Sequence, residues 1–464
     1  MKLQSTQKNC PSSQFELRPY QREDCEFLKT HNFAGCFNEQ RTGKTPTAIV
    51  SIKERGIDKT VIVCPKSAMY SWAAEWQNWG TGLATVLRGP TKQKERALEN
   101  WESGALILSY GSLKSTKAYE GLLLAILKKK PQAAIVDEAH RIKDRNSANA
   151  KAIFKLGTHT QYRIALTGTP APNKPEELWS ILHFLFPQTF KSFWTFVNEF
   201  CSTTQMCISG HHFTQITGIR RDKQYALTQL LSQIATQRKR KEVMQWLPDK
   251  EYVHITLEPT AAQTKYLFEL QNYFETEDVV VQGILDRLIR YRQICLDPGL
   301  LKLKGNAPKT DWILDYLEDY PERPTIIFSK FTSYLLRLAE SLQKYKPMLI
   351  IGDKSPKQRQ EAVDNFQSGK CNLLLINIDA GKESLTLDRA DAIIFTDKFP
   401  PVGDILQAED RFIATTKEKA DKAHVIYELT IQGTYDEQIY KLLDKRFAHV
   451  DVINDFKNYM KGER

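Results

Sequence analysis

Residues 133–140 read AAIVDEAH, a run of small and aliphatic residues that ends abruptly in the carboxylates Asp137 and Glu138. A short apolar run of this kind is typical of a buried strand in a parallel sheet. The residues that follow, beginning EAHRIKD, have a helical pattern. The stretch therefore predicts one strand and helix of an α/β sheet, with both acids at the carboxyl end of the strand, where such sheets place their sites.

The same pattern recurs in two regions of the chain. In the first region the further strands are TVIVCP (60–65), ALILSY (105–110) and RIALTG (163–168). In the second region they are PTIIFSK (324–330), PMLIIGD (347–353), NLLLINI (372–378) and DAIIFTD (391–397). We therefore predict an α/β fold of two lobes, each a parallel sheet with crossover helices.

Between these regions, residues of about 175–305 lose the strand rhythm and become helical, aromatic and basic. We expect a first lobe over residues 1–248 that carries a helical insertion at about 175–245. We expect a second lobe over residues 249–464 that carries a helical protrusion at about 255–305. These helical segments would surround the cleft between the lobes, and the boundaries follow the length expected of domains.

The composition favours a polyanionic partner. The 464 residues include 65 Lys and Arg against 55 Asp and Glu, a net charge of +10. An excess of this sign is most often associated with nucleic acid. No long apolar run occurs, and the start MKLQSTQKNCPSSQ has no apolar signal core. We expect a cytoplasmic location in a bacterial or phage-infected cell.

The eight cysteines are scattered without a C-x-x-C motif, which indicates free thiols in a reducing compartment. One cluster, Cys201, Cys207, His211 and His212, raises the alternative of a metal site. Its spacing fits no standard zinc pattern, so we do not expect a metal there.

The stretch CFNEQRTGKTPTAIVSI places Gly43, Lys44 and Thr45 after a short apolar run and before a helical pattern. This arrangement aims backbone N–H groups at phosphate, with Lys44 neutralising the β and γ phosphates and the Thr45 hydroxyl binding Mg²⁺. The full phosphate-loop pattern has glycine where this chain has Asn38. A lone GKT is also compatible with a purely structural turn.

The two acids of AAIVDEAH strengthen the phosphate-site interpretation. Asp137 would hold Mg²⁺ through water, and Glu138 would orient and deprotonate the attacking water. The alternative is that both acids only cap the following helix. A strand-borne GKT and a strand-borne DEAH in one lobe favour a nucleotide site that uses ATP and Mg²⁺.

With these residues in view, the chain resembles the SWI/SNF-like ATPases of the superfamily 2 helicases and translocases, whose two lobes are RecA-like. The resemblance rests on ordered segments over nearly the whole chain: ELRPYQ (16–21), VIVCPKSAMYSWAAEW, ILSYGSL (107–113), DEAHRIKDRNS, ALTGTPAPNKPEELWSIL, LLSQIATQRKRKEVMQWLPDK (230–250), IRYRQICLDPGL (289–300), IIFSKFTSYL, INIDAGKESLTLDRADAIIFTD and QAEDR. As a small stand-alone motor, the chain resembles phage or bacterial proteins that move branched DNA.

The resemblance implies roles in nucleotide binding. Gln21 would recognise adenine, and the segment Arg41, Thr42, Gly43, Lys44 and Thr45 would surround the phosphates. From the second lobe, Gln407 and Arg411 would complete the ATP site and act in catalysis.

The resemblance also implies a DNA track along the strand-end loops. Its expected contacts are Lys66, Ser67, Thr169, Lys382 and Ser384. Their alternative is to be ordinary polar residues of loops. Such contacts would bind the DNA backbone without reading sequence and would weaken with salt.

Two basic clusters are further candidates for DNA contact. The first is Arg238, Lys239, Arg240 and Lys241, and the second is Arg287, Arg290 and Arg292. A charge run is often only a solvated face, which is the alternative for the first cluster. For the second, packing at the lobe interface is the stronger alternative.

The chain departs from the group's pattern at several positions. Asn38 and Arg41 stand where small residues or glycine are usual, Asp297 replaces a histidine, and KESLTL replaces a glycine-rich loop. The last motif of the group usually has two arginines directed at the γ phosphate. In this chain the first is Arg411, and the position of the second arginine is occupied by Ala414. Three explanations stay open: Arg411 suffices with help from Lys417 or Lys419, the alignment shifts locally, or the protein binds without turnover. We favour the first.

We therefore expect a DNA-dependent ATPase that tracks along duplex or branched DNA as a monomer and acts in branch migration or fork remodelling during recombination, repair or replication. Nucleosome remodelling is not expected, because this sequence carries almost nothing besides the motor segments. The alternatives are an ATP-dependent clamp or recruitment factor and, third, an RNA helicase. Residues of about 200–225 would be either a DNA-engaging hairpin or padding on the first lobe.

Overall fold

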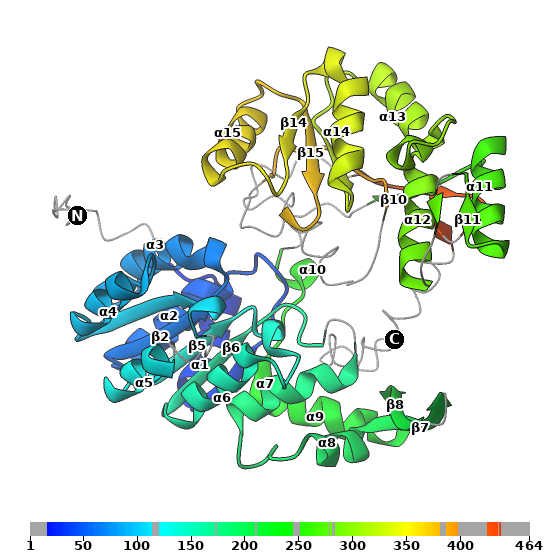
Figure 1. The fold of residues 1–464 in the computed structure, drawn as a ribbon. Helices are drawn as coiled ribbons and strands as arrows, with labels where there is room; N and C mark the ends of the chain where they lie inside the picture. The colour runs from blue at the N-terminus through cyan, green and yellow to red at the C-terminus, as the bar shows by residue number, and fades with distance from the viewer. Residues whose placement is uncertain are drawn as a thin grey trace. The chain divides into compact units, whose positions relative to one another are not determined.

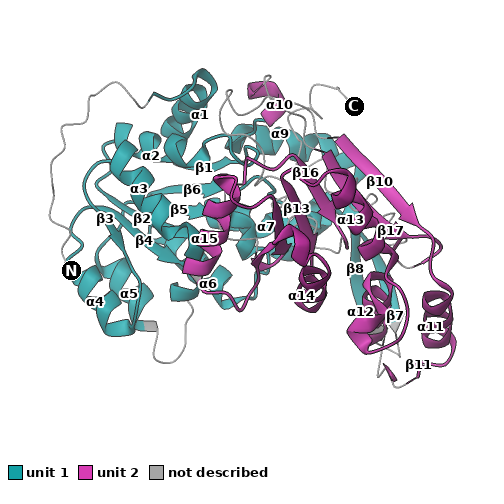
Figure 2. Cartoon of the chain, turned by 90° about the horizontal axis from the view of Figure 1, so that it is seen from above, with its two compact units in different colours: residues 1–239, 451–464 teal, residues 240–450 magenta. Residues whose placement is uncertain are grey.

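The computed structural model describes residues 16–113, 120–171, 174–208, 211–244, 251–277, 279–280, 284–380, 387–397, 425–434 and 436–437. The chain divides into two compact units, with the change from the first to the second at Lys239 and Arg240 (Figure 2). Each unit is built around its own parallel sheet with helices on both faces (Figure 1). The predicted fold class, two α/β parallel-sheet lobes, is confirmed.

The seven described strands of the first sheet pair in parallel. In sheet order they are β3 (Ala84–Val86), β4 (Gly104–Ser109), β2 (Lys59–Cys64), β5 (Ala133–Asp137), β6 (Tyr162–Leu166), β1 (Phe33–Cys36) and β9 (Ala235–Thr236). Alternate residues face opposite cores, as in β2, where Val61 and Val63 join one cluster and Ile62 and Cys64 the other. A strand buried on both faces must be apolar throughout, which explains why these runs are readable in the sequence.

Helices cover both faces of this sheet. One face packs against α1 (Pro19–Thr30), α2 (Lys44–Glu54) and α3 (Met69–Trp79). The other packs against α4 (Thr91–Glu99), α5 (Glu120–Lys128), α6 (Ala148–Thr158), α7 (Leu178–Leu185), α8 (Phe193–Phe200) and α9 (Gln224–Ile234). Short 3₁₀ turns follow the strands or precede helices: η1 (Lys66–Ala68), η2 (Tyr110–Leu113), η3 (Ala139–Ile142), η4 (Pro175–Glu177) and η5 (Arg221–Lys223).

The second unit has a six-stranded parallel sheet. Its order is β10 (Glu251–Leu257), β17 (Val425–Ile431), β16 (Ala392–Phe395), β13 (Thr325–Ser329), β15 (Leu373–Asn377) and β14 (Met348–Ile350). Its other elements are α10 (Arg240–Val243), α11 (Ala261–Asn272), the pair β11 (Glu275–Thr276) and β12 (Val279–Val280), α12 (Ile284–Leu296), η6 (Pro298–Leu301), α13 (Pro308–Asp319), α14 (Thr332–Ser341), η7 (Gln343–Tyr345) and α15 (Pro356–Gln367).

The region 175–305 is not uniformly helical, which corrects the expectation from sequence. The strands β7 (Cys201–Ile208) and β8 (His211–Ile219) form an antiparallel hairpin beyond α8 and α9 (Figure 1). In addition, β10 is an edge strand of the second sheet. Neither segment has the continuous apolar run of a buried strand, because β7 reads CSTTQMCI, β8 reads HHFTQITGI and β10 reads EYVHITL.

No helix among the described residues is long and apolar enough to cross a membrane.

Candidate nucleotide site

The phosphate loop lies between β1, which ends at Cys36, and α2, which begins at Lys44. The loop turns through left-handed backbone at Arg41, with φ 64°, and at Gly43, with φ 81°. A Cβ on Gly43 would lie 1.9 Å from Nε2 of Gln21. The left-handed backbone therefore favours glycine at position 43, and any larger residue there would also displace the Gln21 amide.

The Lys44 ammonium lies inside its own loop. It donates to the carbonyl oxygens of Asn38, at 2.9 Å, and Glu39, at 3.0 Å, and the residue is only 9% exposed. The Thr42 hydroxyl donates to the same Glu39 carbonyl at 2.8 Å. A buried cation that is held by carbonyls at the start of a helix is placed to bind an anion there, because phosphate oxygens are stronger acceptors than neutral carbonyls.

The helix α1 holds this loop from the side. The Gln21 amide donates to the Thr42 carbonyl at 3.0 Å, and its oxygen accepts from the backbone N–H of Arg18 at 2.8 Å. The Tyr20 hydroxyl donates to the same Thr42 carbonyl at 3.0 Å. Gln21 therefore orders the phosphate loop, and adenine recognition by Gln21 stays a prediction.

The two acids lie at the end of β5, as the sequence predicts. Asp137 accepts a hydrogen bond from the indole Nε1 of Trp72 at 2.8 Å and another from the backbone N–H of Glu138 at 3.0 Å. Glu138 has left-handed backbone, with φ 52°, and its Oε1 accepts from the Gln40 amide at 3.0 Å. The Tyr110 hydroxyl donates to the Asp137 carbonyl at 2.5 Å and fixes the turn. Strained backbone at a non-glycine residue is common where a side chain must be aimed at a site.

The environments of the two carboxyl groups separate their pKa values. Burial and the neighbouring charge of Glu138 raise the pKa of Asp137 to about 7. Burial also disfavours ionised Glu138, but His140, Lys44 and the Gln40 amide outweigh it and lower the pKa of Glu138. Carboxyl groups that are pushed apart in this way can take different roles, and the ionised one is suited to act as a base.

The residues present fit a magnesium ion. The Glu138 Oε2 atom is buried and accepts no hydrogen bond within the described part of the chain, with His140 Nδ1 3.4 Å away. The Asp137 carboxylate and the Thr45 hydroxyl in the first turn of α2 are likewise oxygen donors, the kind that Mg²⁺ prefers. Asp137 and Thr45 would hold the ion, and the ion would supply positive charge to the phosphates.

The acidic motif is connected to the next strand through His140. Its Nδ1 lies 3.1 Å from the Thr167 hydroxyl, which also accepts from the backbone N–H of Thr169 at 3.1 Å. Thr167 is fully buried and Thr169 is half-buried. A shift at the nucleotide acids therefore has a direct polar route to Thr169, one of the predicted DNA contacts.

Two other predicted DNA contacts in the first unit lie at the same edge of the sheet. Lys66 is exposed and Ser67 is half-buried in η1, directly after β2. Their placement at the carboxyl edge of the sheet agrees with the sequence expectation, and their contact with DNA stays a prediction.

The first basic cluster contains one arginine that is paired with acids of the first unit. Arg238 forms ion pairs with Asp24 at 3.0 Å and Glu23 at 2.6 Å. Arg240 begins α10 and is half-buried. The guanidinium of Arg238 therefore has a structural role inside the first unit, and DNA contact by Arg238 and Arg240 stays a prediction.

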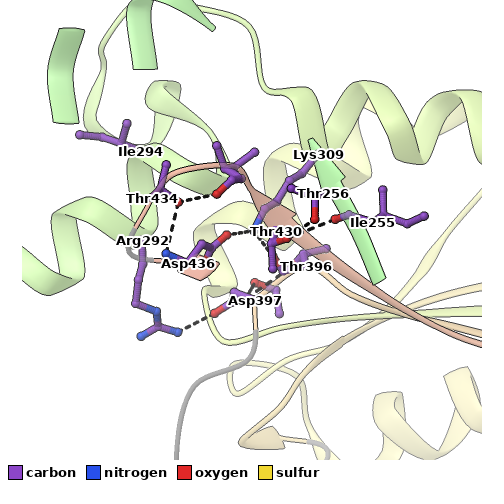
Figure 3. Close-up of polar contacts among 12 residues, drawn as sticks. Ile255, Thr256, Arg292, Ile294, Lys309, Thr396, Asp397, Thr430, Thr434 and Asp436 are labelled. Carbon is purple, nitrogen blue, oxygen red and sulfur yellow. Dashed lines mark hydrogen bonds and ion pairs between the residues drawn. The ribbon is translucent and has the colours of Figure 1, made fainter. Parts of the chain in front are cut away.

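In the second cluster, Arg292 is buried. Its NH2 group donates to Asp397 at 2.6 Å (Figure 3). Asp397 also accepts from the Ser329 hydroxyl at 2.7 Å. Beside this pair, Lys309 bonds to the Asp436 carboxylate and to the Thr396 carbonyl. Arg292 therefore joins α12 to the carboxyl end of the second sheet, within one unit. Packing at the lobe interface, the alternative weighed for this cluster from sequence, stays a prediction.

Several predicted residues lie outside the described part of the chain. They are Lys382 and Ser384 of the DNA track and Gln407, Arg411 and Ala414 of the last motif. Their roles stay predictions.

The cysteine and histidine cluster does not come together among the described residues. Cys207 pairs across the hairpin with His212, while the buried Cys201 lies at the other end of β7. No group of three or more potential metal ligands is found in the described ranges.

Sequence reasoning missed the residues that orient the site. Trp72 and Tyr110 bind Asp137, Gln40 binds Glu138, and Asp24 binds Asn38. Trp72, Tyr110 and Gln40 lie 27 to 98 residues along the chain from their partners, and Asp24 lies 14 residues from Asn38, so no short motif marks these pairs. The only signal was that Tyr110 ends a predicted strand and Trp72 follows one.

A parallel sheet with a lysine-bearing loop after one strand and paired carboxylates after another defines the phosphate-loop class of α/β proteins. Comparison with known families then specifies the group. The SNF2-related domain matches residues 17–300, and the helicase conserved C-terminal domain matches residues 308–413. The chain therefore belongs to the SNF2-related domain family, and the resemblance to SWI/SNF-like ATPases of superfamily 2 is confirmed.

Individual relatives are distant in sequence. The human protein named DNA annealing helicase and endonuclease ZRANB3 is 26% identical over 93% of this chain and 40% of its own length. The Bacillus subtilis protein named putative ATP-dependent helicase/translocase YwqA is 26% identical over 98% of this chain and 50% of its own length. A solved Sulfolobus solfataricus SWI2/SNF2 ATPase core in complex with dsDNA covers 97% of this chain and 95% of its own, with 22% identity and a TM-score of 0.44. The chain thus spans between two fifths and half of the two curated relatives.

Proposed function

We propose that the chain is a DNA-dependent ATPase that translocates along DNA. The observation that carries the proposal is the site in the first unit, where Lys44, Asp137 and Glu138 follow β1 and β5 at the carboxyl edge of one sheet. Membership of the SNF2-related domain family and the names of the relatives, an annealing helicase and a helicase/translocase, support the same activity.

The chemistry assigned to each residue follows from its surroundings. Lys44 would exchange its two loop carbonyls for phosphate oxygens, and the exchange is favourable because the new acceptors are charged. The pKa of Glu138 is lowered, its Oε1 is oriented by Gln40 and its Oε2 accepts no hydrogen bond among the described residues, so it would take a proton from the attacking water. Asp137, held by Trp72, would serve Mg²⁺ rather than the water.

The preferred substrate within this proposal is branched DNA. The β7–β8 hairpin carries no Asp, Glu, Lys or Arg between Cys201 and Ile219. Near its tip, Met206 and Phe213 face each other across the strands and are 36% and 44% exposed. An uncharged ribbon cannot neutralise phosphates, whereas exposed Met and Phe side chains are suited to stack on or wedge between bases that a branch point leaves open.

The base of the hairpin has a different role. Cys201 and Ile219 are buried, and Ile216 packs against the core of the first unit. Phe213 lies on the opposite face of its strand from Ile216, because successive side chains alternate. The hairpin therefore pads the first lobe at its base and presents its apolar pair away from that contact.

A double substitution tests the substrate proposal. Met206→Ala with Phe213→Ala is expected to weaken binding of a four-way junction about tenfold and to leave binding of blunt duplex unchanged. The control is Thr204→Ala with Gln215→Ala, the adjacent cross-strand pair on the same face. Equal loss on junction and duplex, or no loss on either, would contradict a base-stacking role for the hairpin.

A comparison of ATP hydrolysis with duplex, single-stranded DNA, RNA and a four-way junction separates the remaining functions. The motor predicts stimulation by DNA and ATP-dependent movement of the junction. Binding without turnover would instead support a clamp, and stimulation by RNA above DNA would support an RNA helicase.

A further inference from the structure

The first half of the phosphate loop is bonded to the segment that leaves the first unit. The pairing of β1 with β9 continues past both strands, because the Phe37 N–H donates to the Thr236 carbonyl at 2.8 Å and the Glu39 N–H to the Arg238 carbonyl at 3.0 Å. The second unit begins two residues later, at Arg240. The phosphate loop and this exit segment, residues 236–239, therefore form one hydrogen-bonded ribbon.

The side chain of Asp24 ties the same two segments a second time. Its Oδ2 accepts from the Asn38 amide at 2.8 Å, and its Oδ1 accepts from Nε of Arg238 at 3.0 Å. The Asp24 side chain is 1% exposed, so both bonds are made out of contact with water. Arg238 also reaches Glu23, but that carboxylate is 66% exposed. Of the two ion pairs, the one with Asp24 is therefore far less screened by solvent.

The two residues held in this way are also those that hold Lys44, through different atoms. The ammonium bonds to the carbonyl oxygens of Asn38 and Glu39, and these two residues are anchored to Asp24 and Arg238. When a phosphate draws the ammonium away, the carbonyl oxygens of both residues lose a charged hydrogen-bond donor. The remaining hydrogen bonds that these residues make within the ribbon would then readjust.

We propose that Asp24 and Arg238 are positioning residues that couple the phosphate loop to the exit segment, so that occupancy of the loop by nucleotide phosphate changes the setting of residues 236–239 where the chain enters the second unit. The coupling serves the proposed function, because a motor must convert nucleotide binding into a change elsewhere in the chain. The coupling also explains why asparagine, rather than the usual glycine, stands at position 38, because glycine would lack the amide that Asp24 binds.

Asp24→Asn is the sharpest perturbation of the coupling. The substitution keeps the size of the side chain, but an amide has one oxygen and one NH2 group where the carboxylate has two acceptors. Whichever way the new amide turns, its NH2 group faces either the Asn38 amide or Nε of Arg238. Arg238→Gln breaks the same link from the other side, and Arg238→Lys keeps the charge without the geometry of the guanidinium. Glu23→Gln is the matched control, because it removes only the exposed ion pair.

The first measurement is the ratio of DNA-stimulated to basal ATP turnover. Asp24→Asn is expected to lower this ratio about tenfold with nucleotide-free DNA affinity retained, and Arg238→Gln and Arg238→Lys are each expected to lower it about tenfold. The double variant Asp24→Asn with Arg238→Gln should be no worse than the poorer single variant, since both remove one link. Glu23→Gln should stay within about twofold of the wild type.

Other outcomes overturn the inference. If Arg238→Gln weakens DNA binding and its salt dependence while Asp24→Asn does not, Arg238 is a DNA contact and the coupling role is wrong. If the variants lose basal and stimulated turnover in the same proportion, the network is only structural.

The second measurement does not depend on DNA. Hydrogen exchange at the amides of Phe37 and Glu39 should be slow in the wild type, should change when an ATP analogue and Mg²⁺ are added, and should lose that response in Asp24→Asn. A wild-type response without DNA-stimulated turnover would refute the proposed function and leave the coupling intact. No response to nucleotide at these amides would refute the coupling, whether or not DNA stimulates turnover.

Discussion

The buried pair of Arg292 and Asp397 provides a stability test of the second unit. Their side chains are 7% and 1% exposed, and the two groups are 2.6 Å apart. Arg292→Met removes the cation and leaves Asp397, among the described residues, with donors on its other oxygen alone, namely the Ser329 hydroxyl, the Lys330 N–H and, at 3.4 Å, the Thr396 hydroxyl. Removal of one partner of a buried ion pair costs about 3–5 kcal/mol, because the remaining charge is left in a medium of low polarity.

The control is Arg290→Met, the same substitution on the same helix. Arg290 pairs with Asp286 one turn away, and both side chains are about one-third exposed. A pair of this kind contributes about 0.5 kcal/mol or less. The two variants therefore differ mainly in burial of the pair.

Native-state hydrogen exchange is the suitable assay, because it reports on each unit separately in a chain that need not unfold in one step. In Arg292→Met, the amides of β13 and β16 that exchange through opening of the second unit should exchange roughly two to four orders of magnitude faster. Those of β2 and β5 should be unchanged. If Arg292→Met behaves like Arg290→Met, the pair is not a structural link and the DNA-contact interpretation of Arg292 returns.

Three further substitutions have defined outcomes. Gly43→Ala should abolish nucleotide binding measured by calorimetry, because its Cβ would collide with the Gln21 amide, whereas Gly56→Ala, with a similar φ of 68° and no atom within 4 Å, should bind nucleotide normally. In metal-free protein the pKa of Asp137 is raised to about 7, so the folded state binds more protons than the unfolded state between about pH 4 and 7. The free energy of unfolding should therefore fall as the pH rises through that window. Asp137→Asn should remove this slope, as measured by melting curves at several pH values. Arg411→Ala should reduce DNA-stimulated turnover about a thousandfold in steady-state assays if one arginine does the work of two, and a loss below tenfold would show that it does not.

The sheets were readable from the sequence because central parallel strands are buried on both faces. All eight predicted strands lie in the two sheets, since runs such as IVC in β2 and LLLIN in β15 have no other stable environment than a doubly covered sheet. The edge strand β10, with the sequence EYVHITL, was missed because half of its residues face solvent and carry polar groups. The β7–β8 hairpin was left open for the same reason.

The candidate site was predictable where it rests on short motifs. Gly43, Lys44, Asp137 and Glu138 lie in the loops and at the strand end that their motifs indicate. The partners that give these residues their properties were not predictable, because they come from distant segments. Asp24 and Arg238 are separated by more than two hundred residues, and a run of basic residues around Arg238 indicates charge but not its buried partner.

The most direct test of whether the site in the first unit works as a motor is the rate of ATP hydrolysis by the wild-type chain. This rate is measured with and without four-way-junction DNA. Stimulation by DNA is expected, with turnover falling to background in Lys44→Ala and Glu138→Gln while both variants still bind the junction. A wild-type chain that binds the junction and shows no stimulated hydrolysis would contradict the assignment and identify the protein as an ATP-dependent clamp.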